Sequence, residues 1–362
     1  MREFIVSNSP FVKTKQNTSK LSFHLFFVLL FFALFAVIKN GVIPYFQESS
    51  QISIIFFPIL FILTGIITSL LVDLLVQVLF KINVKSNYLD SVNTGLILTL
   101  ILPMYTPLWL VAAGVSIAII SKYIMLKLNK KVILMPVLIG WGIIMGSYML
   151  KVIPPIDYLN PLEINLGTPL SRTGKLDSIG DYNYLVKPYG NLFDFLFGFV
   201  PGGLGTTSML LCILAYLYLT ANGFIKWKIP LGVVLTVFFT TLLIGGINGL
   251  GIWYALFQVC SGMLAFGSIF IAATNETSPV TPIGQILYSI FLGLLIVVLR
   301  FFTPLVDGAL VAMLFMPITR DYFDYNGAIS NLNFNKSIFL FVIGWLLIIF
   351  LGVFLGIHYL HI

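Results

Sequence analysis

Apolar residues dominate the chain in long runs that short polar segments separate. The runs cover residues 21–38, 53–80, 92–103, 106–121, 132–150, 191–222, 230–246, 251–272, 284–304, 306–318 and 337–358. A helix of about 20 apolar residues spans a bilayer. The third and tenth runs are short, and Pro201-Gly202-Gly203-Leu204-Gly205 interrupts the sixth. The pattern predicts an all-α, polytopic membrane protein of about 10–11 transmembrane helices.

One long polar segment, residues 151–190, divides the apolar runs into two groups. It carries five prolines, and a loop of this length is usually functional. The sequence therefore predicts an N-terminal five-helix half at 1–150, the loop at 151–190, a C-terminal five-helix half at 191–325 and an additional helix at 326–362. Two five-helix repeats are typical of transporters.

The composition excludes several classes of protein. Hydrophobic residues make up 59% of the chain and charged residues 9%, whereas soluble proteins carry about 25% charged residues. A soluble enzyme, a disordered chain and a nucleic-acid binder are excluded. The cysteines Cys212 and Cys260 have no paired spacing, so no metal site or disulfide framework is predicted.

The distribution of basic residues predicts the orientation. Lysine and arginine gather in residues 1–20, 81–85 and 122–131, and the loops between these segments are nearly free of them. Because cytoplasmic loops carry the excess of positive charge, the N-terminus is expected in the cytoplasm of a cell-membrane protein. Residues 151–190 are then extracytoplasmic, and Lys226 and Lys228 return to the inside.

Acidic residues inside or beside the apolar runs are candidates for an ion pathway. Asp73 lies within the second run, where a lone carboxylate costs about 2.5–3.5 kcal/mol. Such a residue usually has a partner or moves charge. Glu276 and Asp307 lie at run ends, where water can reach them. Arg300 ends its run and is interpreted as an interfacial anchor.

Two glycine- or hydroxyl-containing segments are candidates for functional sites. The glycine-rich segment at 201–208 leaves backbone amides free at a helix start, through Gly202, Gly203, Gly205, Thr207 and Ser208. The alternative is a kink packed by glycine. Thr168, before Pro169 in the external loop, is either a turn residue or a functional hydroxyl.

The order of these motifs resembles the D subunit of the Rnf ion-translocating electron-transport complex and its relative, the B subunit of sodium-pumping NADH:quinone reductase. The likeness spans roughly residues 9–325. It rests on Ser9-Pro10, Ser91-Val92-Asn93-Thr94-Gly95-Leu96-Ile97-Leu98, Thr168-Pro169-Leu170, the Pro201 to Ser208 segment, Thr277-Ser278-Pro279-Val280-Thr281-Pro282-Ile283-Gly284, Arg300 and Asp307-Gly308. Thr206 stands where the family has an acid, and Asn165 where it has a serine.

The resemblance implies a flavin-carrying membrane subunit of an ion-translocating (H⁺ or Na⁺) oxidoreductase complex. A flavin transferase would attach FMN to Thr168, with Gly202, Gly203, Gly205, Thr207 and Ser208 nearby, and a second, non-covalent flavin stays open. The implied partners are the other membrane and peripheral subunits, the flavin transferase and membrane lipid. The chain would be one subunit of a translocase and not catalytic alone.

Two alternatives stay open. Two five-helix halves with a broken helix also suit a solute channel or secondary transporter with no redox cofactor. A structural subunit that has lost its flavin is the other. Bound flavin distinguishes the flavin-carrying subunit from both alternatives.

Overall fold

A computed structural model describes residues 18–47, 53–80, 88–104, 106–127, 134–150, 169–172, 181–275, 277–302 and 308–330. These residues form helices joined by turns, with no strand among them. The predicted all-α, polytopic membrane fold is confirmed. The proposed terminal helix at 337–358 lies outside the described residues.

The first half of the chain forms long helices where the sequence is continuously apolar. Its elements are α1 (Thr18–Val37), the π-helix η1 (Ile38–Val42), α2 (Ile43–Gln47), α3 (Ser53–Phe80), α4 (Tyr88–Ile101), α5 (Leu108–Lys127) and α6 (Pro136–Met149). Proline at the first position of α6 suits a helix start, because the amide it lacks would have no partner there.

The second half alternates long helices with short, broken ones. Its elements are η2 (Pro169–Arg172), α8 (Tyr182–Leu185), η4 (Lys187–Tyr189), α9 (Leu192–Phe197), α10 (Met209–Ala221), α11 (Lys228–Ile247), α12 (Ile252–Cys260), α13 (Leu264–Gly267), η5 (Ser268–Ala272), α14 (Pro282–Phe302), α15 (Gly308–Phe315), η6 (Met316–Thr319) and α16 (Arg320–Ser330).

Five helical stretches in the described residues are long and apolar enough to cross a membrane. They are Ser19–Phe46, Ile54–Leu79, Leu108–Met125, Lys228–Ile247 and Pro282–Phe301. The apolar helices α4, α6 and α10 are shorter than a full span. Outward-facing side chains of α3 such as Leu75, Val78 and Leu79 are exposed, as expected of a surface that lipid covers.

Hydropathy suggests one continuous helix over the apolar run at 251–272, but the structure shows two helical parts. The run breaks at Ser261-Gly262-Met263, where Gly262 has a φ of 72°, and the two parts are bent by 57°. Irregular backbone at membrane depth is tolerated only where protein or a wet cavity surrounds it. The sixth run is interrupted between α9 and α10, as the proline and glycines predicted.

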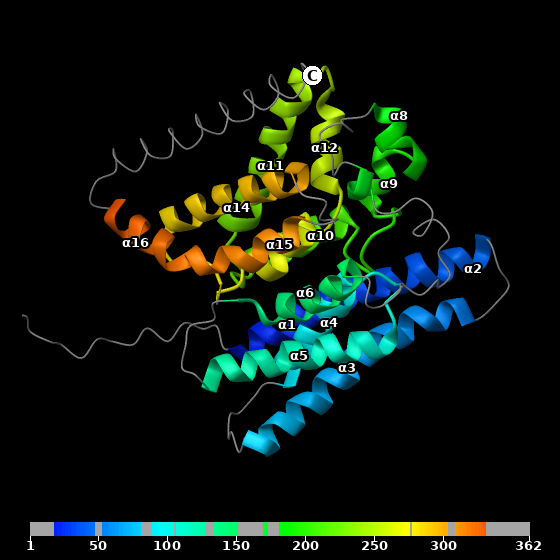
Figure 1. The fold of residues 1–362 in the computed structure, drawn as a ribbon, viewed down its shortest axis with the longest axis vertical. Helices are drawn as coiled ribbons and strands as arrows, with labels where there is room; N and C mark the ends of the chain where they lie inside the picture. Colours follow the sequence, from blue (N-terminus) through cyan, green and yellow to red (C-terminus); the bar gives the residue numbers. More distant parts are fainter. Residues whose placement is uncertain are drawn as a thin grey trace, which may run out of the picture.

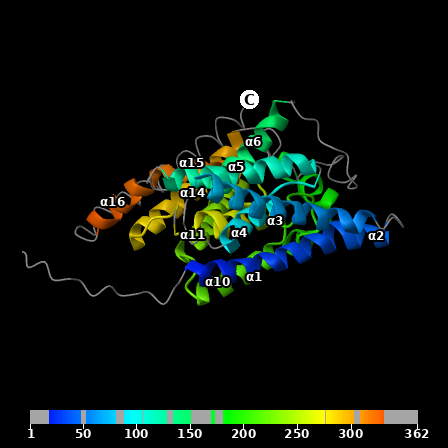
Figure 2. The same cartoon turned by 90° about the horizontal axis from the view of Figure 1, so that it is seen from below.

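The long helices of each half pack against their neighbours along the chain. In the first half α3 contacts α4 and α5, and α5 contacts α6; in the second, α11 contacts α12 and α14, and α14 contacts α15 and α16. Figure 1 shows α1 to α6 gathered on one side of the molecule and α11 to α16 on the other. The halves meet where α1 contacts α10 and α6 contacts α15, and α1 and α10 lie together along one edge in Figure 2.

Helices α3 and α4 approach each other closely. A Cβ atom on Gly95 would lie 2.6 Å from the Gly65 carbonyl oxygen and 2.9 Å from Ser69 Cβ. Small residues let helix backbones approach in membranes. The glycine pair therefore fixes the spacing between α4 and the helix that carries Asp73.

Candidate functional site

Asp73 is fully buried on α3 and has two hydrogen-bond donors. The hydroxyl of Tyr123, on α5, donates to Asp73 Oδ1 at 2.5 Å. The amide Nε2 of Gln77, one turn further along α3, donates to Oδ2 at 2.9 Å. Both carboxylate oxygens are therefore satisfied by neutral donors, which is how a charge inside a membrane becomes tolerable. Sequence reasoning found Asp73 but missed Tyr123, because 50 residues separate the two.

An ion pair lies one residue along α5 from Tyr123. Lys122, the neighbour of Tyr123 on α5, donates to the carboxylate of Asp90 in the first turn of α4. The pair links the first turn of α4 to the C-terminal part of α5.

The glycine-rich turn between α9 and α10 is joined to the end of α4. The amide of Leu204 donates to Leu102 O at 3.0 Å, and the amide of Gly205 donates to Leu100 O at 3.1 Å. These bonds satisfy carbonyls that the end of a helix leaves without partners. The amides of Leu204 and Gly205 are therefore not available to an anion.

Two side chains of the π-helix η1 also form hydrogen bonds with this turn. Asn40 Nδ2 donates to Leu204 O at 2.9 Å. Lys39 Nζ donates to Thr207 Oγ1 at 3.0 Å, and that hydroxyl donates to Gly198 O at 2.8 Å. Lys39 is only 9% exposed. A buried lysine side chain and a π-helix, a feature frequent at functional sites, thus coincide at this seam between the two halves.

The other predicted residues of the turn are tightly packed. A Cβ on Gly202 would lie 2.8 Å from Thr207 Cγ2, and one on Gly203 would lie 2.5 Å from Thr206 Oγ1. Ser208 caps α10 by accepting the Leu211 amide at 3.3 Å. These residues have local structural roles, and the kink packed by glycine describes most of the segment.

The fit of this region to the anionic phosphate of FMN rests on Lys39 and Thr206. Lys39 supplies a buried cationic head, and Thr206 Oγ1 is buried with no hydrogen-bond partner among the described residues. A buried hydroxyl without a partner costs free energy unless something pairs with it. These two side chains suit an anionic group, whereas the Gly205 amide is already bonded to Leu100 O.

Arg300 is not an interfacial anchor. It is 4% exposed, and its guanidinium reaches from α14 to the break between α12 and α13. Nη1 donates to Gln258 O at 2.6 Å, and Nη2 donates to Ser261 O at 3.2 Å. The cation occupies the carbonyl end of a half-helix, where positive charge is favoured. Arg300 thereby stabilises the break that the hydropathy pattern did not reveal.

A second cluster of polar contacts fixes the motif Thr277-Ser278-Pro279. Lys226 Nζ donates to Ser278 O, Ser278 Oγ and Pro279 O at 2.8 to 3.1 Å. Asp324 Oδ1 accepts the amides of Val280 and Thr281. Burial, reinforced by the charge of Arg320, lowers the pKa of Lys226 to about 8, and Asp324 opposes that shift. The motif is therefore held in place immediately before α14 begins.

Three predicted residues, Thr168, Glu276 and Asp307, lie outside the described residues. Leu170, two positions after Thr168, is buried. Within the part of the chain that the structure describes, no group of three histidine, cysteine or acidic residues could hold a metal ion.

Comparison with known proteins decides the family. The model of the NQR2, RnfD, RnfE family matches residues 5–331. The chain belongs to the NQR2, RnfD, RnfE family. The resemblance drawn from the motifs is thereby confirmed, and the match ends just after α16.

Several similar proteins cover different shares of the chain. The D subunit of the proton-translocating ferredoxin:NAD(+) oxidoreductase complex of Clostridium ljungdahlii is 28% identical over 318 residues, 86% of this chain and 91% of that protein. The D subunit of an ion-translocating oxidoreductase complex of Stutzerimonas stutzeri is 37% identical over 33% of this chain and 34% of that protein. The B subunit of the Na(+)-translocating NADH-quinone reductase of Chromohalobacter salexigens is 25% identical over 64% of this chain. The chain spans 56% of the length of that last relative.

Proposed function

We propose that this chain is a membrane subunit of an ion-translocating oxidoreductase complex. The family match over residues 5–331 carries the proposal, because relatives named as subunits of such complexes match this chain. Within the complex, the other membrane and peripheral subunits would exchange electrons with this one. The chain would be part of a translocase and not catalytic alone.

The ion-handling part of the proposal rests on Asp73. A buried carboxyl group held by two neutral donors can change charge by binding one proton or one Na⁺. The Tyr123 hydroxyl and the Gln77 amide orient the carboxylate. Glu276 and Asp307 are further acids for the same pathway, at the ends of their apolar runs.

The redox part of the proposal is FMN attached by a flavin transferase to Thr168. Bound FMN would accept and pass on electrons, while the protein supplies position and electrostatics. Lys39 and Thr206 would face its anionic group, and Thr207 would hold Lys39 in place. A second, non-covalent flavin is a further part of this proposal. Membrane lipid would surround the helices.

The test is in-gel flavin fluorescence of the denatured protein made in its native host. A fluorescent wild-type band that disappears in Thr168→Ala is expected, with Ser171→Ala from the same loop as the matched control that stays fluorescent. Intact mass measures the added FMN independently. A dark wild-type band with the mass of the bare chain would remove the covalent flavin.

A solute channel or secondary transporter without a redox cofactor is the second candidate. The break between α12 and α13 favours it, because discontinuous helices form substrate sites in transporters. A dark band in the flavin assay, followed by solute uptake into vesicles that contain the chain alone, would favour this function.

A further inference from the structure

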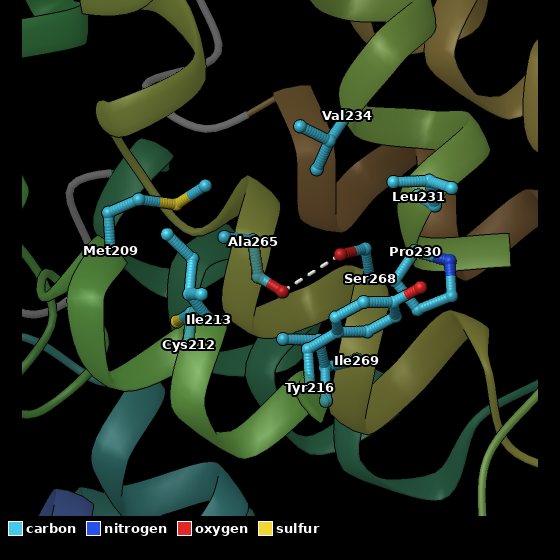
Figure 3. Close-up of a pocket in the computed structure, with 10 residues that line it drawn as sticks. All are labelled: Met209, Cys212, Ile213, Tyr216, Pro230, Leu231, Val234, Ala265, Ser268 and Ile269. Carbon is cyan, nitrogen blue, oxygen red and sulfur yellow. Dashed lines mark hydrogen bonds between the residues drawn. The ribbon is translucent and has the colours of Figure 1, made fainter. Parts of the chain in front are cut away.

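An apolar groove opens on the surface of the second half, between α10, α11 and the π-helix η5. The groove has a volume of about 120 Å³ and is lined by residues of all three helices. Figure 3 shows side chains of α10, including Cys212 and Ile213, facing Leu231 and Val234 of α11. Ile213 is 42% exposed on the rim, whereas Cys212 is buried in the floor. The groove is therefore open to the surrounding membrane.

The polar atoms of the groove are already bonded within the protein. Ser268 Oγ donates to Ala265 O at 2.8 Å, the dashed line in Figure 3. The Tyr216 hydroxyl donates to Trp227 O at 3.1 Å. The groove thus presents hydrocarbon and sulfur surface to whatever enters it. A hydrocarbon chain fits this lining, whereas a polar solute would lose its hydration without compensation.

One end of the groove has an aromatic side chain and a positive charge. Pro230 and Leu231, in the first turn of α11, lie two and three residues after Lys228, which itself follows Trp227. Trp227 is 53% exposed, and Lys228 Nζ lies 5.8 Å from the centre of its ring. Tryptophan and lysine are typical of the membrane–water interface, and anionic lipids gather at the cytoplasmic leaflet.

We propose that the groove binds one acyl chain of an anionic phospholipid whose phosphate lies at Lys228. The acyl chain runs from Pro230 toward Met209 between α10 and α11, and the headgroup stays at the interface beside Trp227. The bound lipid fills the space next to η5 and so supports the irregular part of the broken span. The site involves neither flavin nor Asp73.

The test uses the full-length chain, purified with the subunits that remain bound, stripped of lipid and loaded with dioleoyl phosphatidylglycerol or dioleoyl phosphatidylcholine. The two lipids share their acyl chains and differ in headgroup charge. Native mass spectrometry counts retained lipid. Wild type is expected to retain about fivefold more phosphatidylglycerol than phosphatidylcholine. One lysine near an anionic headgroup contributes about 1 kcal/mol, which corresponds to this ratio. Lys228→Gln should abolish that preference.

A matched pair of variants on α11 locates the acyl chain. Val234→Trp fills the groove and should lower retention of both lipids, whereas Leu235→Trp, on the exposed side of the same helix, should change neither. Equal retention of both lipids by wild type would overturn the headgroup assignment. Retention that Val234→Trp leaves unchanged, or co-purification of an isoprenoid quinone or a protein helix in the groove instead, would overturn the site.

Discussion

At the scale of single residues, the hydrogen bond from Tyr123 to Asp73 allows a direct test of whether Asp73 handles the ion. Tyr123→Phe removes the donor to Asp73 Oδ1 and changes little in volume. A hydrogen bond to a charged group contributes about 1.5–3 kcal/mol. If Asp73 handles the ion in its ionised form, we expect ion transport to fall at least tenfold in Tyr123→Phe and to cease in Asp73→Asn.

Ion uptake into vesicles that contain the assembled complex, driven by its electron donor, measures this effect. Tyr322→Phe is the matched control, because Tyr322 is exposed on α16 and its hydroxyl should be dispensable. Asp73→Asn vesicles that pump like wild type with a normally assembled complex would remove Asp73 from the mechanism.

At the scale of elements, the glycine-rich turn holds α1 and α4 together. A Cβ on Gly205 would lie 2.6 Å from Leu100 Cδ2 and 3.0 Å from the Phe32 carbonyl oxygen. Because Phe32 O belongs to the backbone of α1, it cannot move without shifting the helix. Gly205→Ala is therefore expected to destabilise the fold by about 1–3 kcal/mol, the usual cost of overpacking.

Thermal unfolding in detergent, followed by the fraction of chain that stays monodisperse, measures that cost. Gly246→Ala on α11 is the control, because nothing lies within 4 Å of its added Cβ. That variant should match or exceed wild type, by about 0.4–1 kcal/mol at most. A Gly205→Ala chain as stable as Gly246→Ala would show that the turn yields without cost.

The same elements explain how far the sequence predicts the fold. Hydropathy predicts the helices because a span of apolar residues has no other satisfactory structure in lipid. The break at Ser261-Gly262-Met263 contains no proline and no charged residue, so hydropathy does not predict it. What stabilises it is Arg300, which lies 42 residues from Gln258 in sequence. The bond from Tyr123 to Asp73 and the bonds from Lys226 to Ser278 and Pro279 also join distant segments. No local sequence pattern contains these contacts.

At the scale of the whole molecule, the orientation depends on how the chain crosses between α9 and α11. Helix α10 has 13 residues and rises only about 20 Å, less than the hydrocarbon core of about 30 Å. The glycine-rich turn and α9 must therefore complete this crossing. Lys187 and Asn222, exposed at its two ends, are then expected on opposite sides of the membrane.

Single cysteines test this orientation in whole cells. In a chain with Cys212→Ala and Cys260→Ala, Lys187→Cys should react with a membrane-impermeant maleimide added outside. Asn222→Cys, close to the basic residues Lys226 and Lys228, should react only after the cells are opened, because positive loops stay in the cytoplasm. Labelling of both positions from the same side would mean that residues 192–221 form a re-entrant hairpin. The orientation predicted for the second half would then be reversed, and Lys228 would face the outer leaflet.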